Sequence, residues 1–130
     1  MNNDPQRIND LSKIIVDAAF KVHTALGPDL LESAYEHCLF YELCKQGIHA
    51  ATQVILPIVY DEKEIEAGYR IDMLVEDTII IELKSVDRLL PVHEAQLPSY
   101  LKLADKRPGL LINFNVSQLR NGIKRMVNDF

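Results

Sequence analysis

Residues 69–85 read YRIDMLVEDTIIIELKS, and this stretch predicts two β-strands joined by an acidic turn. The second strand is β-branched and apolar at Ile79–Ile81, which indicates a buried central strand. Because strand side chains alternate between faces, Glu82 and Lys84 point to the same side of the sheet. A carboxylate and an ammonium on such a strand must either pair with each other or hold something else.

The register of the two strands decides whether Asp72 joins this pair. A three-residue loop at Glu76–Thr78 pairs Val75 with Ile79. The same register sets Asp72 opposite Glu82, whereas a two-residue loop would put Asp72 on the other face. Directly opposed residues have Cβ atoms roughly 4.5–5.5 Å apart. Two carboxylates at that separation repel unless a cation lies between them, and such oxygen ligands suit Mg²⁺ or Mn²⁺.

A structural interpretation stands beside this one. Lys84 would then form an ion pair with Glu82 or Asp72 on a solvent-facing sheet surface, as many surface charges do. The Glu-x-Lys spacing alone does not separate the two. The apolar run on the same strand and the matching Asp72 favour a functional site.

The composition is typical of a globular protein of one domain spanning residues 1–130. The chain is 48% hydrophobic and 25% charged, with a mass of 14.8 kDa. No apolar run reaches membrane-spanning length, and the amino terminus MNNDPQRIND lacks the pattern of a signal peptide. Cys38 and Cys44 have neither metal-site nor disulfide-scaffold spacing. We therefore expect a cytoplasmic protein with no membrane association.

The net charge of −5 argues against a broad surface that coats nucleic acid, because such surfaces are basic. It leaves room for a local basic groove around an acidic metal site. The positive residues gather late in the chain, at Lys102, Lys106, Arg107, Arg120, Lys124 and Arg125.

Two helices are predicted before the first strand. Asp4 caps the first with Pro5 at its first position, and Gly27-Pro28 ends it. Asp29 is expected to cap the second helix, which runs to about Lys45. Glu32 falls in its first turn, where the helix dipole by itself favours an acid.

Strands and a third helix follow. Residues 52–60 predict a strand in which Pro57 marks an edge or a bulge, and a short strand begins at Glu64. Pro91 opens a helix to about residue 105 that displays His93, Gln96 and Tyr100 along one side, while Pro98 should kink it. Residues 110–114 form an apolar strand parallel to the Glu82 strand. The tail, 117–130, has apolar residues at helical spacing, but Gly122 weakens that assignment. The resulting order, α-α-β-β-β-α-β, predicts an α/β fold with a mixed sheet flanked by helices.

These residues meet a known pattern. Asp72 followed by Glu82-Leu83-Lys84 on the next strand, in an αβββαβ order, resembles the PD-(D/E)XK nuclease superfamily. The segment from Gln96 to Tyr100 is similar to the Q-x-x-x-Y element of its RecB-like branch. More narrowly, LGPDLLESAYEHCL, GYRIDMLVED, IIELKSV, HEAQLPSYLKL and GLLINFNV resemble the family named for its G-x-x-E-x-x-Y motif, over roughly residues 8–126.

The chain departs from that family at two positions. Asp29 stands where the motif has its glycine, although Glu32 and Tyr35 are in place. Pro98 stands where the helix usually carries an ordinary residue. Neither change removes a group that binds metal or handles protons.

The resemblance implies a restriction-endonuclease-like αβββαβ core and a set of roles. Asp72 and Glu82 would hold a divalent metal, with the Leu83 carbonyl as a further ligand. Glu32 would reach the metal directly or through water. Lys84 would orient or activate the attacking water, or stabilise charge on the phosphate.

On the substrate side, the resemblance implies that Gln96 and Tyr100 line the cleft and touch either substrate or Lys84. His93 is a candidate for the rim.

Two functions follow as hypotheses. The first is a Mg²⁺-dependent nuclease acting on DNA, with catalytic residues Glu32, Asp72, Glu82 and Lys84. The second is a catalytically weak or inactive binding or regulatory module that keeps the nuclease fold, which the acidic composition and small size favour. A homodimer would enlarge the surface available for binding.

Overall fold

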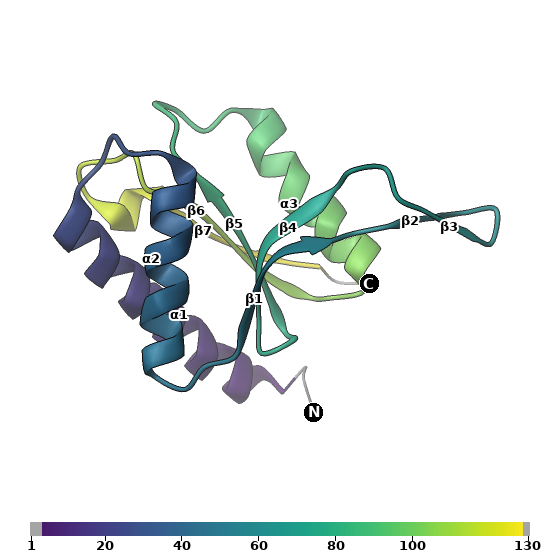
Figure 1. Cartoon of the computed structure of the whole chain (residues 1–130), viewed down its shortest axis with the longest axis horizontal. Coiled ribbons are helices and arrows are strands. Elements are labelled where there is room, and N and C mark those ends of the chain that lie inside the picture. The colour runs from purple at the N-terminus through teal and green to yellow at the C-terminus, as the bar shows by residue number, and fades with distance from the viewer. Residues whose placement is uncertain (1–3, 129–130) are drawn as a thin grey trace.

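The computed structural model describes residues 4–128. Within these residues, two helices precede five consecutive strands; a third helix, a sixth strand, one short 3₁₀ turn, η1 (Leu119–Gly122), and a seventh strand follow. The helices are α1 (Pro5–Leu26), α2 (Glu32–Lys45) and α3 (Pro91–Ala104), and the strands are β1 (Ala50–Ile55), β2 (Ile58–Tyr60), β3 (Lys63–Ile65), β4 (Arg70–Val75), β5 (Ile79–Lys84), β6 (Pro108–Asn113) and β7 (Ile123–Val127) (Figure 1).

Five of the strands form one mixed sheet in the order β1-β4-β5-β6-β7. The β5–β6 pair is parallel, and the other pairs of this sheet are antiparallel. The α3 crossover joins β5 to β6, as parallel neighbours require. The predicted αβββαβ core with a mixed sheet flanked by helices is confirmed.

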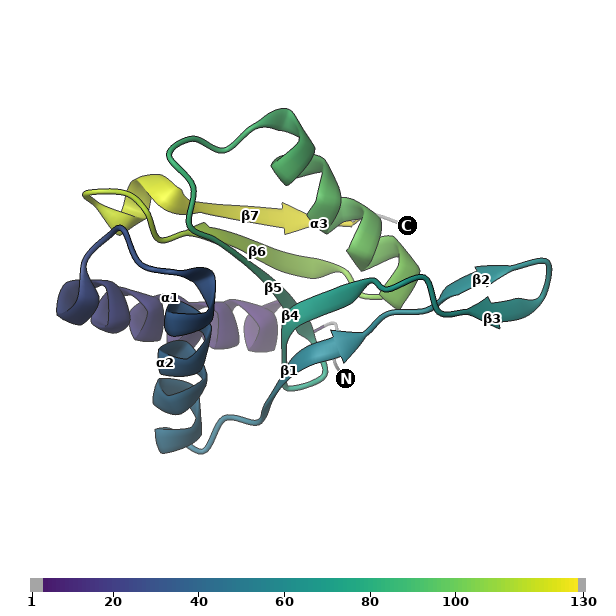
Figure 2. The same cartoon turned by 45° about the horizontal axis from the view of Figure 1, so that its top comes forward.

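The helices cover both faces of the sheet (Figure 2). On one face, α1 and α2 pack against Ile79, Ile81 and Leu83 of β5. On the other face, α3 packs against Ile80 of β5 and Leu111 of β6. All three isoleucines of β5 are fully buried, which confirms the predicted central strand.

The β4–β5 hairpin has the predicted register. Val75 pairs with Ile79 and Met73 with Ile81. The turn is tight: Thr78 N–H donates to the Val75 carbonyl, and the residues between them have left-handed backbone with φ of 51°. Because Val75 pairs with Ile79, the loop has three residues, Glu76–Thr78. This odd length places Asp72 across from Glu82.

The predicted start of the second helix is wrong. The cap is Leu31, which makes no side-chain capping bond, and Glu32 is the first residue of α2. Asp29 instead lies in the preceding loop with φ of 75°, the left-handed conformation that glycine adopts most readily. The Tyr35 hydroxyl fixes this loop, because it donates to the Gly27 carbonyl at 2.7 Å and accepts from Leu30 N–H at 3.2 Å.

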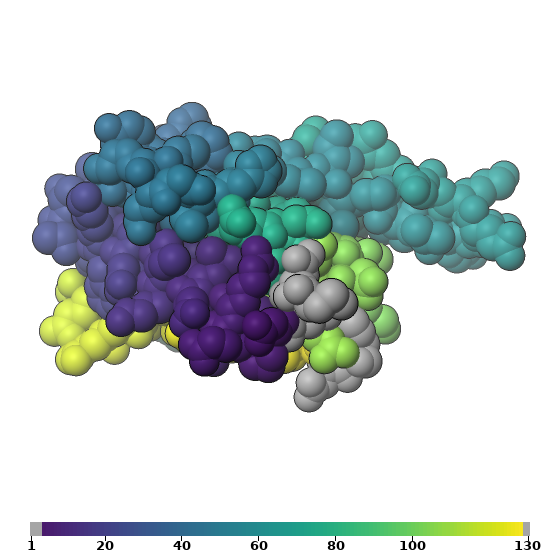
Figure 3. All heavy atoms as spheres, turned by 90° about the horizontal axis from the view of Figure 1, so that it is seen from below, coloured from purple at the N-terminus to yellow at the C-terminus, as the bar shows by residue number. Residues whose placement is uncertain are grey.

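The predicted strand over residues 52–60 is two strands. It breaks around Pro57, where the chain leaves the main sheet after β1 and continues into β2. Strands β2 and β3 pair only with each other and project from the body of the molecule (Figure 3).

The tail is not helical within the described residues, which exclude 129–130. After η1 it forms β7 along β6, with Ile123 paired to Ile112. Gly122 allows this because a Cβ there would lie 2.1 Å from the Asn113 carbonyl oxygen. Helix α3 continues through Pro98, whose side of the helix is exposed.

None of the helices in residues 4–128 combines the length and the apolar character needed to cross a bilayer.

Candidate active site

Asp72 and Glu82 meet where the β4–β5 ladder stops. The last paired residues are Met73 and Ile81. Beyond them, carboxylate oxygens accept the hydrogen bonds of the backbone N–H groups. Asp72 Oδ2 accepts from Leu83 N–H at 2.8 Å, and Asp72 N–H approaches Glu82 Oε1 at 3.4 Å. The sequence places these acids in register, and the structure brings them together.

Glu82 is held in surroundings that oppose its charge. Its side chain is only 3% exposed. Burial, followed by repulsion from Asp72, raises the pKa of Glu82 to about 8, while the Asp72 backbone bond and Lys84 act the other way. A carboxyl group in this state gains strongly from a cation placed beside it.

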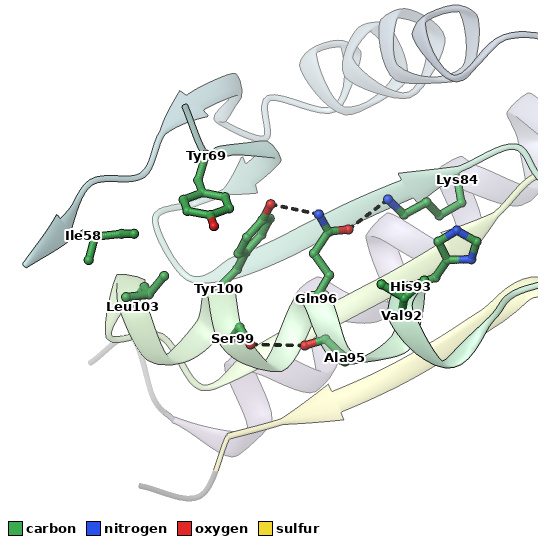
Figure 4. A pocket seen from close by; sticks show the side chains of 10 residues that line it. All are labelled: Ile58, Tyr69, Lys84, Val92, His93, Ala95, Gln96, Ser99, Tyr100 and Leu103. Atoms are coloured by element: carbon green, nitrogen blue, oxygen red, sulfur yellow. Dashed lines mark hydrogen bonds between the residues drawn. The ribbon is translucent and has the colours of Figure 1, made fainter. Parts of the chain in front are cut away.

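Lys84 is held by a chain of hydrogen bonds from α3 rather than by an acid. Its Nζ donates to Gln96 Oε1 at 3.0 Å, and Gln96 Nε2 donates to Tyr100 Oη at 2.9 Å (Figure 4). Within the described residues, Lys84 makes no ion pair within 4.0 Å of either Asp72 or Glu82. The surface ion pair considered from the sequence is therefore absent from this part of the chain.

Tyr100 is the last member of this series of hydrogen bonds. It is 6% exposed, and its ring meets that of Tyr69 edge to face, with centroids 6.0 Å apart. Burial raises the pKa of the Tyr100 hydroxyl, which therefore keeps its proton at neutral pH. Because Tyr100 Oη accepts from Gln96, its own O–H remains available as a donor.

Helix α2 contributes a second wall. Glu32, Glu36 and Gln53 line a cavity of about 400 Å³ together with Asp72 and Leu83. Partial burial raises the pKa of Glu32, nearby Lys84 lowers it and Asp72 raises it. As the first residue of α2, Glu32 also lies at the favourable end of the helix dipole.

Glu36 and Gln53 were missed from the sequence. Gln53 Nε2 donates to Glu36 Oε1 at 2.7 Å, and Gln53 has left-handed backbone with φ of 51°. Gln53 lies on β1 opposite Asp72 of β4, between the Thr52–Met73 and Val54–Ile71 pairs. Glu36 follows Glu32 by one helical turn, and this spacing is the signal that marks it.

His93 lies in the first turn of α3, at the rim of the site. Its Nδ1 accepts from Leu90 N–H at 2.9 Å, so the ring caps the helix. It lines the same pocket as Lys84 and Gln96. Its position therefore combines a structural role with exposure to the cleft.

The donor set fits a hard divalent cation. Asp72 and Glu82 supply carboxylate oxygens, and two carboxylates plus water are what Mg²⁺ commonly receives from a protein. Across residues 4–128, no three Asp, Glu, His or Cys side chains lie close enough to form a metal cluster unaided. Glu32 thus shares the cavity with Asp72 without completing such a cluster.

Comparison with known proteins identifies the family. Residues 9–126 match the model of the PD-(D/E)XK nuclease superfamily. Neither the curated proteins nor the solved structures give a significant match. The match spans both strands of the hairpin that bears Asp72 and Glu82, together with α2 and α3. The chain therefore belongs to the PD-(D/E)XK nuclease superfamily.

Proposed function

We propose that this chain is a Mg²⁺- or Mn²⁺-dependent nuclease that hydrolyses phosphodiester bonds of DNA, and that within its superfamily it belongs to the G-x-x-E-x-x-Y family. One observation carries the proposal. Two acids, Asp72 and Glu82, face each other at a strand end, with Lys84 on the same face and tied to Gln96.

The metal would be held by Asp72, Glu82 and the Leu83 carbonyl, with Glu32 reaching it through water. When bound, a divalent ion supplies a nucleophile at neutral pH and neutralises charge on the phosphate. The bond from Leu83 N–H fixes one Asp72 oxygen, and no hydrogen bond from residues 4–128 occupies the other. Glu32 lines the same cavity as Asp72 and Leu83.

Lys84 would act on the water or on the phosphate. One of its three N–H groups is occupied by Gln96, so two remain for these partners. Gln96 is itself oriented by Tyr100, which fixes its carbonyl oxygen toward the lysine. Such pre-orientation lowers the cost of reaching the reactive geometry.

A second candidate is a binding or regulatory module with little chemistry. The observation in its favour is the net charge of −5, which disfavours a tight grip on a polyanion. Fold membership alone does not decide between the two. Whether the chain cleaves nucleic acid decides between the nuclease and the binding module.

The test is a cleavage assay on plasmid, single-stranded DNA and RNA with Mg²⁺ or Mn²⁺. We expect wild type to cut DNA, and expect Asp72→Asn, Glu82→Gln and Lys84→Met each to lose at least ~100-fold in rate. Asp10→Asn, an exposed acid on α1, is the matched control and should retain full activity. Cutting that survives in all three site variants would point to a contaminant and refute the catalytic assignment.

A further inference from the structure

A groove lies beside the lysine end of the site. We name it the α3 groove; it has a volume of about 570 Å³, within the roughly 300–1,000 Å³ of small-molecule sites. It runs along α3 to the base of the β2–β3 hairpin (Figure 4). Its lining residues are Ile58, Tyr69, Lys84, Val92, His93, Ala95, Gln96, Ser99, Tyr100 and Leu103.

The walls of the α3 groove are apolar and aromatic. Ile58 and Leu103 lie at the hairpin end with the two tyrosine rings, and Lys84 lies toward the other end (Figure 4). Among these described lining residues, Lys84 is the sole lysine or arginine. A duplex backbone requires cations spaced along its phosphates, and this groove offers a cation at one end only.

The neighbouring hairpin repels phosphate. Its turn, its return strand and the residue after that strand carry Asp61, Glu62, Glu64 and Glu66 against a single lysine, Lys63, and all five residues are exposed. A phosphate chain is thus disfavoured at the hairpin end of the groove and favoured at the Lys84 end. A ligand with one phosphate at Lys84 and an apolar ring toward the hairpin matches both ends.

Tyr69 provides the ring surface for such a ligand. It is 42% exposed, although its backbone is fixed because its carbonyl accepts from Leu56 N–H at 2.9 Å. Its ring is set edge to face with Tyr100, with an interplanar angle of 64°, so the two do not stack and cover each other's faces. A fixed, half-exposed aromatic ring next to an apolar wall is the arrangement that stacks an unpaired base.

We propose that the α3 groove binds an unpaired nucleobase next to the phosphate held at Lys84, so that the substrate is a single strand or an unpaired end. This rests on the proposed nuclease function and names its substrate class. Bases inside a duplex are stacked in pairs and do not expose a face to Tyr69 unless they are flipped out.

The test is binding of a fluorescently labelled single-stranded oligonucleotide and of the matching duplex to the full chain in EDTA, which prevents metal-dependent cleavage. We expect the single strand to bind at least tenfold more tightly. Tyr69→Ala should weaken single-strand binding about tenfold, and Tyr69→Phe should restore it, because stacking needs the ring and not the hydroxyl. Tyr41→Ala, which removes an exposed tyrosine on α2, is the matched control.

Equal affinity for duplex and single strand, or unchanged binding by Tyr69→Ala, would overturn the groove proposal. Cleavage assays in Mg²⁺ on the same molecules separate the two proposals. Duplex cleavage that is indifferent to Tyr69→Ala keeps the nuclease function and rejects the groove. Single-strand binding that depends on Tyr69 but gives no cleavage keeps the groove and rejects the nuclease.

Discussion

At the scale of single residues, the site holds two acids in an electrostatically unfavourable arrangement that a bound cation would relieve. Glu82 is buried beside a second acid, and its carboxylate accepts a long hydrogen bond of 3.4 Å from the Asp72 N–H. Lys84, the nearest cation along the strand, is tied to Gln96 and forms no ion pair with Glu82 within the described chain. A purely structural sheet surface would gain stability by pairing these charges, so their separation favours function over stability.

Glu82 should make the stability of the metal-free chain depend on pH. Its pKa is 4.5 when unperturbed and about 8 in the folded chain, so folding favours the protonated form. This contribution to the free energy of unfolding is complete below pH 4.5. As the pH rises toward 8, the free energy of unfolding falls by roughly 2–4 kcal/mol. Urea unfolding in EDTA from pH 4 to 9 measures it.

Glu82→Gln should flatten this pH dependence and make the chain more stable than wild type at pH 9. The exposed Glu62→Gln should keep it. At pH 9, saturating Mg²⁺ should restore the free energy of unfolding of wild type, because an ion that binds only the folded state stabilises that state. The same Mg²⁺ should leave the free energy of unfolding of Glu82→Gln unchanged. A wild-type curve already flat in EDTA would refute the burial argument.

Replacing Asp29 with glycine should stabilise the folded chain. Its φ of 75° costs a non-glycine residue roughly 1 kcal/mol, although aspartate tolerates it better than most. We expect Asp29→Gly to raise the free energy of unfolding by about 0.5 kcal/mol and Asp29→Ala to lower it. The urea midpoints of the three chains test this order, and a more stable Asp29→Ala would contradict it.

At the scale of elements, helix α3 serves the site and the core together. Leu97 and Leu101 are fully buried against the sheet, while Gln96 and Tyr100 reach toward Lys84 from a neighbouring side of the helix. Gly109 on β6 allows this close packing, since a Cβ there would lie 3.0 Å from Leu97 side-chain atoms. The helix therefore has little freedom to shift without moving Gln96.

Pro98 weakens α3 and its replacement should strengthen it. Proline removes the hydrogen bond to the residue four earlier and costs a helix interior about 3 kcal/mol relative to alanine. We expect Pro98→Ala to raise stability by roughly 1–3 kcal/mol, measured by thermal and urea unfolding. Pro91→Ala is the matched control, because a proline at the first helical position costs nothing, and this variant should not gain.

At the scale of the whole molecule, the β2–β3 hairpin exposes apolar side chains that line neither the cavity beside Asp72 nor the α3 groove. The β2–β3 hairpin pairs only within itself and exposes Val59, Tyr60 and Ile65. A two-stranded hairpin is marginal alone in water, so contact with another surface would stabilise it. Val59 does not line the α3 groove, which leaves this contact compatible with substrate binding.

A homodimer joined through the hairpin is the outcome we predict. Light scattering after size-exclusion chromatography should give twice the 14.8 kDa of one chain for wild type. Val59→Glu should give the monomer mass, because it would bury a charge in the contact. Val127→Glu alters an equally exposed residue, 71% against 68%, on β7 and should stay dimeric. A monomeric wild type would refute the prediction.

The local sequence pattern was sufficient to predict the strands, the turn and the crossover that form the backbone of the site. The odd-length turn at Glu76–Thr78 determined the face of Asp72, and the apolar run of β5 marked the buried centre of the sheet. The crossover through α3 followed from a helix between two apolar strands. These features rest on alternation, turn length and chain connectivity, which neighbouring residues specify.

The tertiary structure decided what distant segments do to one another. It begins α2 at Glu32, because the Tyr35 hydroxyl holds the loop before it. It bonds Lys84 to Gln96, twelve residues away, where the strand spacing alone suggested an acid. It also adds Glu36 with Gln53 to the wall beside Asp72. The sequence by itself determined which acids share a face, since that depends on local register. Only packing across the sheet decided their burial and their partners, because those depend on contacts between parts of the chain that local pattern does not relate.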